Sequence, residues 1–328
     1  AYLGTLVVGT AAADPEAVPG LLAFEHGAWQ RLPVRPSSPY AKLAEWLSIQ
    51  PADEGKLVAV GGARGGAHAN VRWTVWTGSL TDGLTEQEQT FETFGGWGAG
   101  DQTGVVVTGS GPMLVGSWQS ARTGLDIDVW LPHGSTWVRQ DPAGTPLEST
   151  PTELAAARGA FPVGPGAIVA GSVLHLGDGV VRQASAVWRS SSGNTGWTRI
   201  DLPGGTASEA VSATCAGPLP DTCTIIGWVD GKLAVWRLDP TGARRVDGIP
   251  EVTVTAESPM PAPVAVGASI ELLVTEGTGT VLVRESAQGW TREPGPAGAV
   301  VAAVLVGSTL YAVLRSPDGS SRLWTYPA

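Results

Sequence analysis

The sequence predicts an all-β protein built from repeated four-stranded units, and three features of the 328-residue chain support this fold class. Glycine (45) and proline (25) make up about 21% of the residues against a usual ~12%, so turns must be frequent. Hydrophobic residues reach 43% while charged residues are only 15%, which is ample for a buried core. Short runs rich in Val, Ala and Trp recur along the chain between turn residues, as expected for short antiparallel strands.

A tripeptide of the form Trp-x-Arg marks the last strand of several repeats. It occurs four times, at Trp29, Trp137, Trp197 and Trp290. The intervals are 108, 60 and 93 residues, and the first and last are close to twice a period of about 50. We interpret Ala243-Arg-Arg245 as a degenerate fifth copy and Phe91-Glu-Thr93 as a weaker sixth.

An apolar pair at the centre of the preceding strand gives a second periodic series. Its seven members are Ala23-Phe24, Val75-Trp76, Val129-Trp130, Val187-Trp188, Val235-Trp236, Leu282-Val283 and Leu323-Trp324. A further apolar run and a small-residue strand precede each pair, which gives four strands per repeat. Antiparallel four-stranded repeats of about 50 residues predict a seven-bladed β-propeller, here a single domain over residues 1–328.

The repeat also predicts details of this fold. The first repeat begins at its second strand and the last ends after its third, which gives 26 strands. We expect Trp130, Trp188 and Trp236 to be buried between neighbouring blades. Residues 40–47 (YAKLAEWL) are the one candidate helix, but they are short and we expect an inner strand there.

One apolar segment is long enough to cross a bilayer. Residues 294–314 carry no charge, but Gly307-Ser308-Thr309 interrupts them near the middle and valine is frequent. These features predict a buried β-hairpin and no integral membrane segment.

Three turns resemble the Asp-box repeats of secreted, sialidase-like propellers, which place Ser-x-Asp-x-Gly-x-x-Trp between the third and fourth strands. The matching positions are Gly134 with Trp137, Gly193 with Trp197 and Gly289 with Trp290. The Asp is absent from these turns, and Ser316-Pro-Asp318-Gly319, which has it, lies one hairpin too early. The resemblance implies a propeller fold. It does not imply sialidase activity, because none of the four tyrosines lies in a motif with Glu and Arg.

The two cysteines, Cys215 and Cys223, flank a turn containing Gly217, Pro218 and Pro220. The pair lacks the further ligands of a structural zinc site, so we predict a hairpin disulfide, with two free core thiols as the alternative. Disulfides persist in oxidising compartments, which indicates an extracellular or cell-envelope protein in its mature form. The sequence is also compatible with a lipid anchor attached upstream of Ala1.

Charge and motifs narrow the possible functions. The formal net charge of −10 makes nucleic acid an unfavourable partner, because the surface repels phosphate backbones. Asp126 and Asp128 share one strand face, but a calcium site would need more oxygen ligands. No G-x-S-x-G, P-loop, C-x-x-C or H-E-x-x-H motif occurs, so we assign no catalytic residue, metal ligand or cofactor.

Long loops after the second strand of the first four repeats, together with the segment GGWGAGDQTG, predict the functional surface. We place Trp97 and Trp118 in loops, where a large aromatic side chain has least structural reason to occur. The predicted ligand contacts are Arg64, His68, Trp97, Asp101, Trp118, Arg122, Asp126 and His175. The alternative is that these loops are tolerated insertions.

The sequence therefore favours an exported, non-enzymatic propeller that binds a carbohydrate or a protein partner, alone or as a subunit of a cell-surface or secreted assembly. The alternative is a glycoside hydrolase or lyase whose carboxylates come from loops. An enzyme of this kind would show two carboxyl groups roughly 5–10 Å apart. A binding protein would show exposed aromatic side chains rimmed by polar groups.

Overall fold

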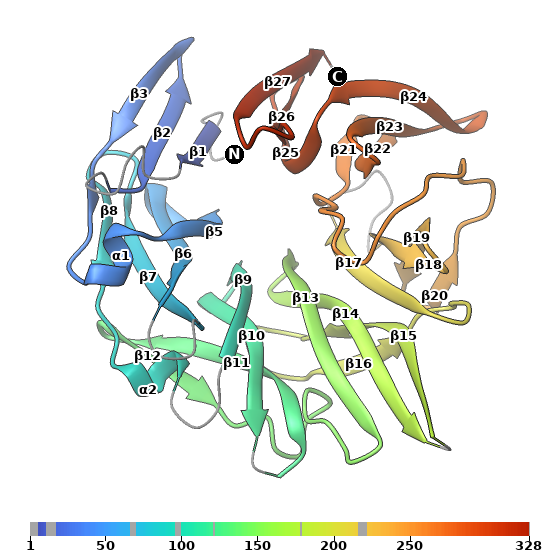
Figure 1. Ribbon diagram of the computed structural model, residues 1–328, viewed down its shortest axis with the longest axis horizontal. Helices are drawn as coiled ribbons and strands as arrows, with labels where there is room; N and C mark the ends of the chain where they lie inside the picture. The colour runs from blue at the N-terminus through green and yellow to red at the C-terminus, as the bar shows by residue number, and fades with distance from the viewer. Residues whose placement is uncertain are drawn as a thin grey trace. The chain divides into compact units, whose positions relative to one another are not determined.

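The computed structural model describes residues 6–10, 18–65, 70–95, 100–120, 122–177, 179–215 and 222–327. They form seven sheets, antiparallel except for one strand pair in the second, that follow one another along the chain and that we number blades 1 to 7 (Figure 1). The chain is an all-β, seven-bladed β-propeller, as predicted. Blade 1 contains β1 (Leu6–Thr10), β2 (Gly20–Glu25) and β3 (Ala28–Leu32). Blade 2 contains β4 (Val34–Arg35), β5 (Glu45–Pro51), β6 (Lys56–Arg64), β7 (Val71–Ser79) and β8 (Gly83–Gln87). Blade 3 contains β9 (Gly100–Thr108), β10 (Gly111–Ser120), β11 (Gly124–His133) and β12 (Thr136–Gln140).

The remaining four sheets follow the same order of strands. Blade 4 contains β13 (Glu153–Val163), β14 (Gly166–Gly177), β15 (Val180–Arg189) and β16 (Thr198–Asp201), and blade 5 contains β17 (Ser208–Thr214), β18 (Cys223–Val229), β19 (Lys232–Asp239) and β20 (Gly242–Arg245). Blade 6 contains β21 (Val264–Val266), β22 (Ser269–Glu276), β23 (Gly279–Ser286) and β24 (Gly289–Ala297). Blade 7 contains β25 (Ala299–Val306), β26 (Thr309–Arg315) and β27 (Ser321–Pro327). Blades 1 and 7 have three strands, as predicted. The strand that the sequence did not predict is β4, which pairs in parallel with β8.

Two predictions about local structure in blade 2 are wrong. Residues 40–47 are not one strand, because the helix α1 (Pro39–Lys42) precedes β5; Ser38 caps its first turn and Pro39 suits the first helical position. Phe91-Glu-Thr93 is not a last strand but part of the helix α2 (Phe91–Phe94). The outer strand β8 comes earlier because Gly83, at φ 78°, closes a tight turn directly after β7. One 3-10 turn, η1 (Asp53–Gly55), also precedes β6.

Tryptophan side chains on the third strands fill the core. Trp76, Trp130, Trp188 and Trp236 are all completely buried. Trp130 packs in a cluster with Val58 and Val75 of blade 2, and Trp236 packs in a cluster with Ile168 and Val187 of blade 4. These clusters join successive blades, which confirms the predicted burial of the third-strand tryptophans.

A bulge in the inner strand recurs opposite a glycine in the second strand. The register shifts between Trp46 and Ser48 in β5, and corresponding irregularities occur in blades 3 and 5. A side chain on the opposing glycine would meet a backbone carbonyl of the bulged strand. The pairs are Gly61 with Glu45, Gly116 with Asp101 and Gly227 with Glu209. Glycine is therefore required at these second-strand positions, because the backbone of the bulged inner strand approaches too closely for a side chain.

By their internal contacts the residues fall into two compact units. The first comprises Ala1–Ala160, Gly164–Ala167 and Ser190–Trp197, and the second comprises Phe161–Val163, Ile168–Arg189 and Thr198–Ala328. The boundary runs through blade 4. The single domain over residues 1–328 stays a prediction.

The disulfide and the β-hairpin predicted from the sequence are both present in the second unit, but the predicted burial of the hairpin is wrong in part, because Val301 and Ala302 of β25 are exposed. Cys215 and Cys223 form a disulfide between the end of β17 and the start of β18. Residues 294–314 belong to β24 and to the hairpin of β25 and β26, which turns at Gly307. Among the described residues, no helix has the length and apolar character needed to cross a membrane.

Candidate functional site

The predicted ligand contacts are dispersed over several strands. His68 and Trp97 lie outside the described residues. The remaining six lie as follows: Arg64 at the end of β6, Asp101 in β9, Trp118 in β10, Arg122 in the turn after β10, Asp126 in β11 and His175 in β14.

The long loops predicted for blades 3 and 4 are wrong. Trp118 lies within β10, because β10 and β11 continue as a paired hairpin to a short turn that ends at Gly124. His175 likewise lies in β14 and pairs with Arg182 of β15. Glycines at positive φ close both hairpins, 99° at Gly124 and 72° at Gly179, so the strands extend where loops were expected.

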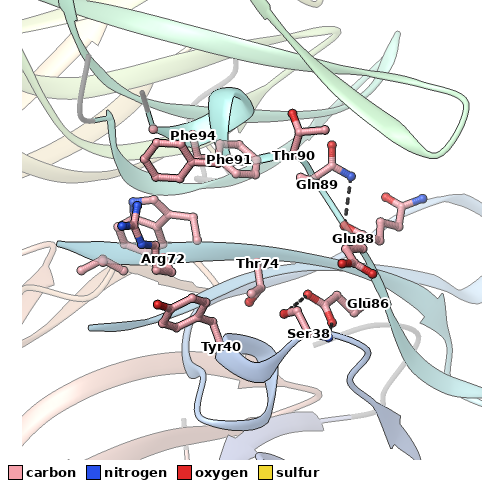
Figure 2. A pocket seen from close by; sticks show the side chains of 14 residues that line it. Ser38, Tyr40, Arg72, Thr74, Glu86, Glu88, Gln89, Thr90, Phe91 and Phe94 are labelled. Carbon is pink, nitrogen blue, oxygen red and sulfur yellow. Dashed lines mark hydrogen bonds between the residues drawn. The ribbon is translucent and has the colours of Figure 1, made fainter. Parts of the chain in front are cut away.

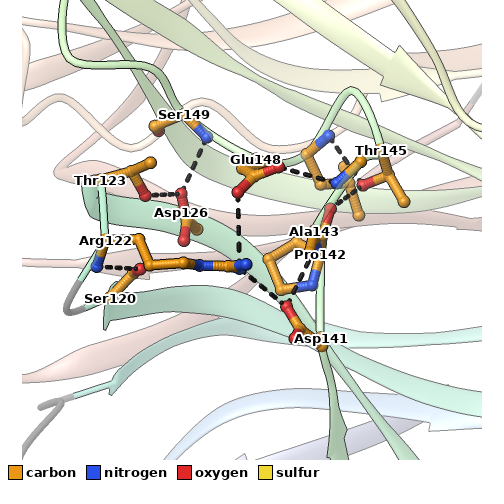
Figure 3. Close-up of polar contacts among 12 residues, drawn as sticks. Ser120, Arg122, Thr123, Asp126, Asp141, Pro142, Ala143, Thr145, Glu148 and Ser149 are labelled. Atoms are coloured by element: carbon orange, nitrogen blue, oxygen red, sulfur yellow. Dashed lines mark hydrogen bonds and ion pairs between the residues drawn. The ribbon is translucent and has the colours of Figure 1, made fainter.

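Arg122 and Asp126 belong to an internal polar network at one end of blade 3 (Figure 3). The Arg122 guanidinium lies 3.0 Å from a carboxylate oxygen of Asp141 and 3.4 Å from one of Glu148. The buried Asp126 carboxylate accepts hydrogen bonds of 2.8 Å from the Thr123 hydroxyl and from the Ser149 backbone N–H. The network holds the segment after β12 against β11.

Asp128 and Trp118 also contact their neighbours within blade 3. Burial raises the pKa of Asp128 to about 6, although Arg139, 3.2 Å away, favours the charged form. The Arg139 guanidinium in turn lies 4.6 Å from the centre of the Trp118 ring. Trp118 also meets Trp130 edge-on, with ring centres 6.2 Å apart. We call the charged residues of this region the blade-3 cluster: Arg122, Asp126, Asp128, Arg139, Asp141 and Glu148.

A different group of side chains surrounds a pocket of about 300 Å³ on blade 2 (Figure 2). The pocket lies between α1, the strands β7 and β8, and α2, so four separate segments contribute to it. We call it the blade-2 pocket. It is lined by Ser38, Tyr40, Val71, Arg72, Trp73, Thr74, Glu86, Gln87, Glu88, Gln89, Thr90, Phe91, Phe94 and Gly95.

Glu86 fixes one side of this pocket. Its carboxylate accepts hydrogen bonds from the backbone N–H groups of Ser37 (2.6 Å) and Ser38 (2.7 Å) and from both serine hydroxyls. Burial pushes the pKa of Glu86 upward, but the bonds from Ser38 and Ser37 outweigh it and hold the pKa below its usual value. Ser38 Oγ also caps α1 at Ala41, so the ionised Glu86 positions the helix that carries Tyr40.

The opposite side is formed by α2 and is tied to blade 3. The Trp130 indole N–H donates to the Thr93 carbonyl at 2.8 Å, and Phe94 lies 5.8 Å from the Trp130 ring. Gln89 accepts a hydrogen bond of 2.8 Å from the Trp137 backbone N–H. These contacts fix the wall of the pocket on elements of regular structure.

Arg72 lies between the rings of Tyr40 and Phe91 (Figure 2). Its guanidinium carbon is 4.4 Å from the centre of the Phe91 ring and 6.0 Å from that of Tyr40. Phe91 is 54% exposed, and Glu88 and Thr90 are exposed beside it. The pocket thus combines aromatic faces, a cation, a carboxylate and neutral polar groups.

The pocket has no counterpart in the predicted repeat, because Phe91 lies in α2 and not at the degenerate strand position that the repeat predicts. Two signals point to it in retrospect. Ser38-Pro39 is a helix-start pattern inside an otherwise all-β repeat, and the repeat fails at Phe91, where the expected Trp-x-Arg is missing. Within the described ranges, no group of three or more His, Cys, Asp or Glu side chains is arranged to hold a metal ion.

Comparison with known proteins supports the fold. No protein-family model matches the chain, and no curated protein matches it significantly. A puromycin-hydrolyzing peptidase of Mycobacterium tuberculosis is similar with a TM-score of 0.60 and 11% identity, over all of this chain and 51% of that protein. The β-propeller domain of the Trilobed protease of Pyrococcus furiosus is similar with a TM-score of 0.55 and 7% identity, over 98% and 92% of the two chains. Prolyl oligopeptidase B of Galerina marginata is similar with a TM-score of 0.53 and 12% identity, over 98% of this chain and 48% of that one. At these identities the likeness shows the β-propeller fold alone.

Proposed function

We propose that this protein is an exported, non-enzymatic propeller that binds a carbohydrate in the blade-2 pocket. The observation that carries the proposal is the exposed Phe91 ring beside Arg72 and Glu88 at the mouth of a concave pocket. Aromatic faces stack on the apolar faces of sugar rings, while guanidinium and carboxylate groups bond to hydroxyls. The pocket is held by α1 and α2, so little ordering is needed on binding.

The state of Glu86 favours binding over glycoside hydrolysis. Hydrolysis uses two carboxyl groups, one of which must carry a proton near neutral pH. Both Glu86 oxygens already accept hydrogen bonds, and its lowered pKa keeps it ionised. Glu88 is the other carboxylate of the pocket and is exposed to solvent at the rim.

The disulfide supports an extracellular or cell-envelope location. Cys223 is buried and Cys215 half-buried, and the bond between them would be short-lived in a reducing cytosol unless protected. The predicted contacts Arg64, Asp101, Trp118, Arg122, Asp126 and His175 remain a rival proposal for the binding surface.

The test is a screen of an oligosaccharide array with the purified protein, followed by calorimetric titration of the best ligand. We expect Phe91→Ala to weaken binding about tenfold, because a stacked aromatic contact contributes about 0.5–1.5 kcal/mol beyond area burial. Trp29→Ala is the matched control, since Trp29 is another exposed aromatic side chain, on blade 1. Equal affinity of Phe91→Ala and parent would contradict the assignment to this pocket. Release of reducing sugar from the bound oligosaccharide would instead support the hydrolase alternative.

A further inference from the structure

Among the residues that the structure describes, four arginines lie over aromatic rings, and three of them share a feature. Arg139 lies over Trp118, Arg237 over Trp290 and Arg284 over Tyr326, at 4.6, 5.9 and 5.5 Å from the ring centres. Each of the three also has a carboxylate partner within the protein. These partners are Asp128, Glu285 and Glu271, respectively.

Arg72 is the fourth member and differs from the other three. Its guanidinium lies between Phe91 and Tyr40, yet it forms no hydrogen bond or ion pair with a described residue. The side chain is half-buried, so the cation is partly withdrawn from water. A partly desolvated guanidinium without an anionic partner is less stable than a paired one.

The chemistry of the guanidinium group indicates which ligand group would pair with Arg72. The two ring centres lie 4.4 and 6.0 Å from the guanidinium carbon, and the N–H donors of a guanidinium project from the edges of its plane. A planar carboxylate in the same plane can accept two parallel hydrogen bonds from such an edge. An Arg72 without an anionic partner among the described residues therefore favours a carboxylate over a neutral hydroxyl.

We infer that the ligand of the blade-2 pocket is an acidic saccharide whose uronate carboxylate pairs with Arg72. The inference rests on the proposed carbohydrate binding at this pocket. Glu88 at the rim then accepts hydrogen bonds from sugar hydroxyls and disfavours densely sulfated chains. The net charge of −10 excludes a general attraction of polyanions, so recognition depends on this one cation.

The test compares acidic saccharides with their carboxyl-reduced forms. The probes are a trigalacturonate and a glucuronate-containing trisaccharide, each titrated beside its carboxyl-reduced counterpart. We expect at least one acidic probe to bind ten or more times more tightly than its reduced form, with an affinity that falls as sodium chloride is raised. Arg72→Gln should remove both the preference and the salt dependence. Arg72→Lys should restore only part of the preference, because it keeps the charge but loses the paired donors.

Arg245→Gln is the matched control, since Arg245 is an exposed arginine on β20 of blade 5. Unchanged melting temperatures of the Arg72 variants would show that the loss is not a loss of folding. Equal affinity for acidic and reduced probes, weakened in both cases by Phe91→Ala, would overturn this inference and leave the proposed function intact. The protein could instead bind a peptide through its C-terminal carboxylate, in an Arg72-dependent manner, and bind no saccharide. That result would overturn the inference that the ligand is a saccharide. Absence of Phe91-dependent binding to any saccharide would overturn both proposals.

Discussion

The blade-2 pocket and the blade-3 cluster are both rich in charged and aromatic side chains, yet their charges are satisfied differently. In the blade-3 cluster, Arg139 pairs with Asp128 and Arg122 pairs with Asp141. In the blade-2 pocket, Arg72 has aromatic neighbours and no described anionic partner, and Phe91 is 54% exposed. The arginines of the blade-3 cluster already have carboxylate partners within the blade, whereas an arginine without such a partner is available to a ligand.

The difference follows from how the two regions are assembled. The blade-3 cluster lies on β11, on β12 and in the segments that flank them, and its ion pairs join residues of these neighbouring segments. The blade-2 pocket is built where α1 and α2 interrupt the repeat. Segments that depart from a regular repeat are not explained by the repeat alone, so they are the more informative place to look for a binding site.

The largest expected effect is that of Trp130→Ala, because Trp130 contacts both regions. Its indole bonds to Thr93 in α2, and its ring packs against Phe94 and Trp118. Loss of this completely buried side chain should cost about 3–5 kcal/mol of unfolding free energy. Urea unfolding measures the change, with the 44% exposed Trp29→Ala as control. An unchanged urea midpoint for Trp130→Ala would show that the contact between blades 2 and 3 is misassigned.

Asp128 makes the blade-3 cluster sensitive to pH. Its pKa is raised from 3.8 to about 6 by burial, so between these values the folded protein binds more protons than the unfolded chain. The unfolding free energy should therefore fall as the pH rises through this window, by at most roughly 3 kcal/mol from this group. Asp128→Asn should remove that part of the decline when unfolding is followed in urea from pH 4 to pH 7.

The matched control for Asp128 is Asp141→Asn. The pKa of the exposed Asp141 is lowered, by the Ala143 N–H first and also by Arg122, so this group contributes stability that is lost as the pH falls. The two variants should thus change the pH dependence in opposite directions. Parallel curves for the parent and Asp128→Asn would contradict the raised pKa.

Asp126→Ala tests whether this residue is structural or contacts ligand. The substitution leaves the buried Ser149 N–H without its acceptor, which should cost about 1–3 kcal/mol. We expect ligand affinity to stay within twofold of the parent at a temperature where both proteins are folded. A folded Asp126→Ala protein that no longer binds would favour the site predicted from the sequence over the blade-2 pocket.

The repeat determined what could be predicted from the sequence. The seven blades, the buried third-strand tryptophans and the Cys215–Cys223 disulfide follow from periodic spacing or local turn chemistry. The pocket could not be predicted in the same way. Tyr40 and Phe91 are 51 positions apart and meet Arg72 only because two short helices replace expected strand positions. The prediction that Trp118 lies in a loop is wrong because strands extend there. Polar and aromatic residues near a turn can belong to an extended hairpin as well as to a loop.

Arg122→Gln should have the smallest effect on stability, and it distinguishes most directly between the blade-2 pocket and the blade-3 cluster as the binding site. Its ion pair with Asp141 is largely solvated, with side-chain exposures of 55% and 69%, and such pairs contribute about 0–1 kcal/mol. The variant should therefore fold and melt like the parent, so any loss of affinity would report contact with ligand. We expect its affinity in the same titration to equal that of the parent, while Phe91→Ala weakens binding. The reverse pattern, a loss with Arg122→Gln and none with Phe91→Ala, would move the binding surface from the blade-2 pocket to the blade-3 cluster.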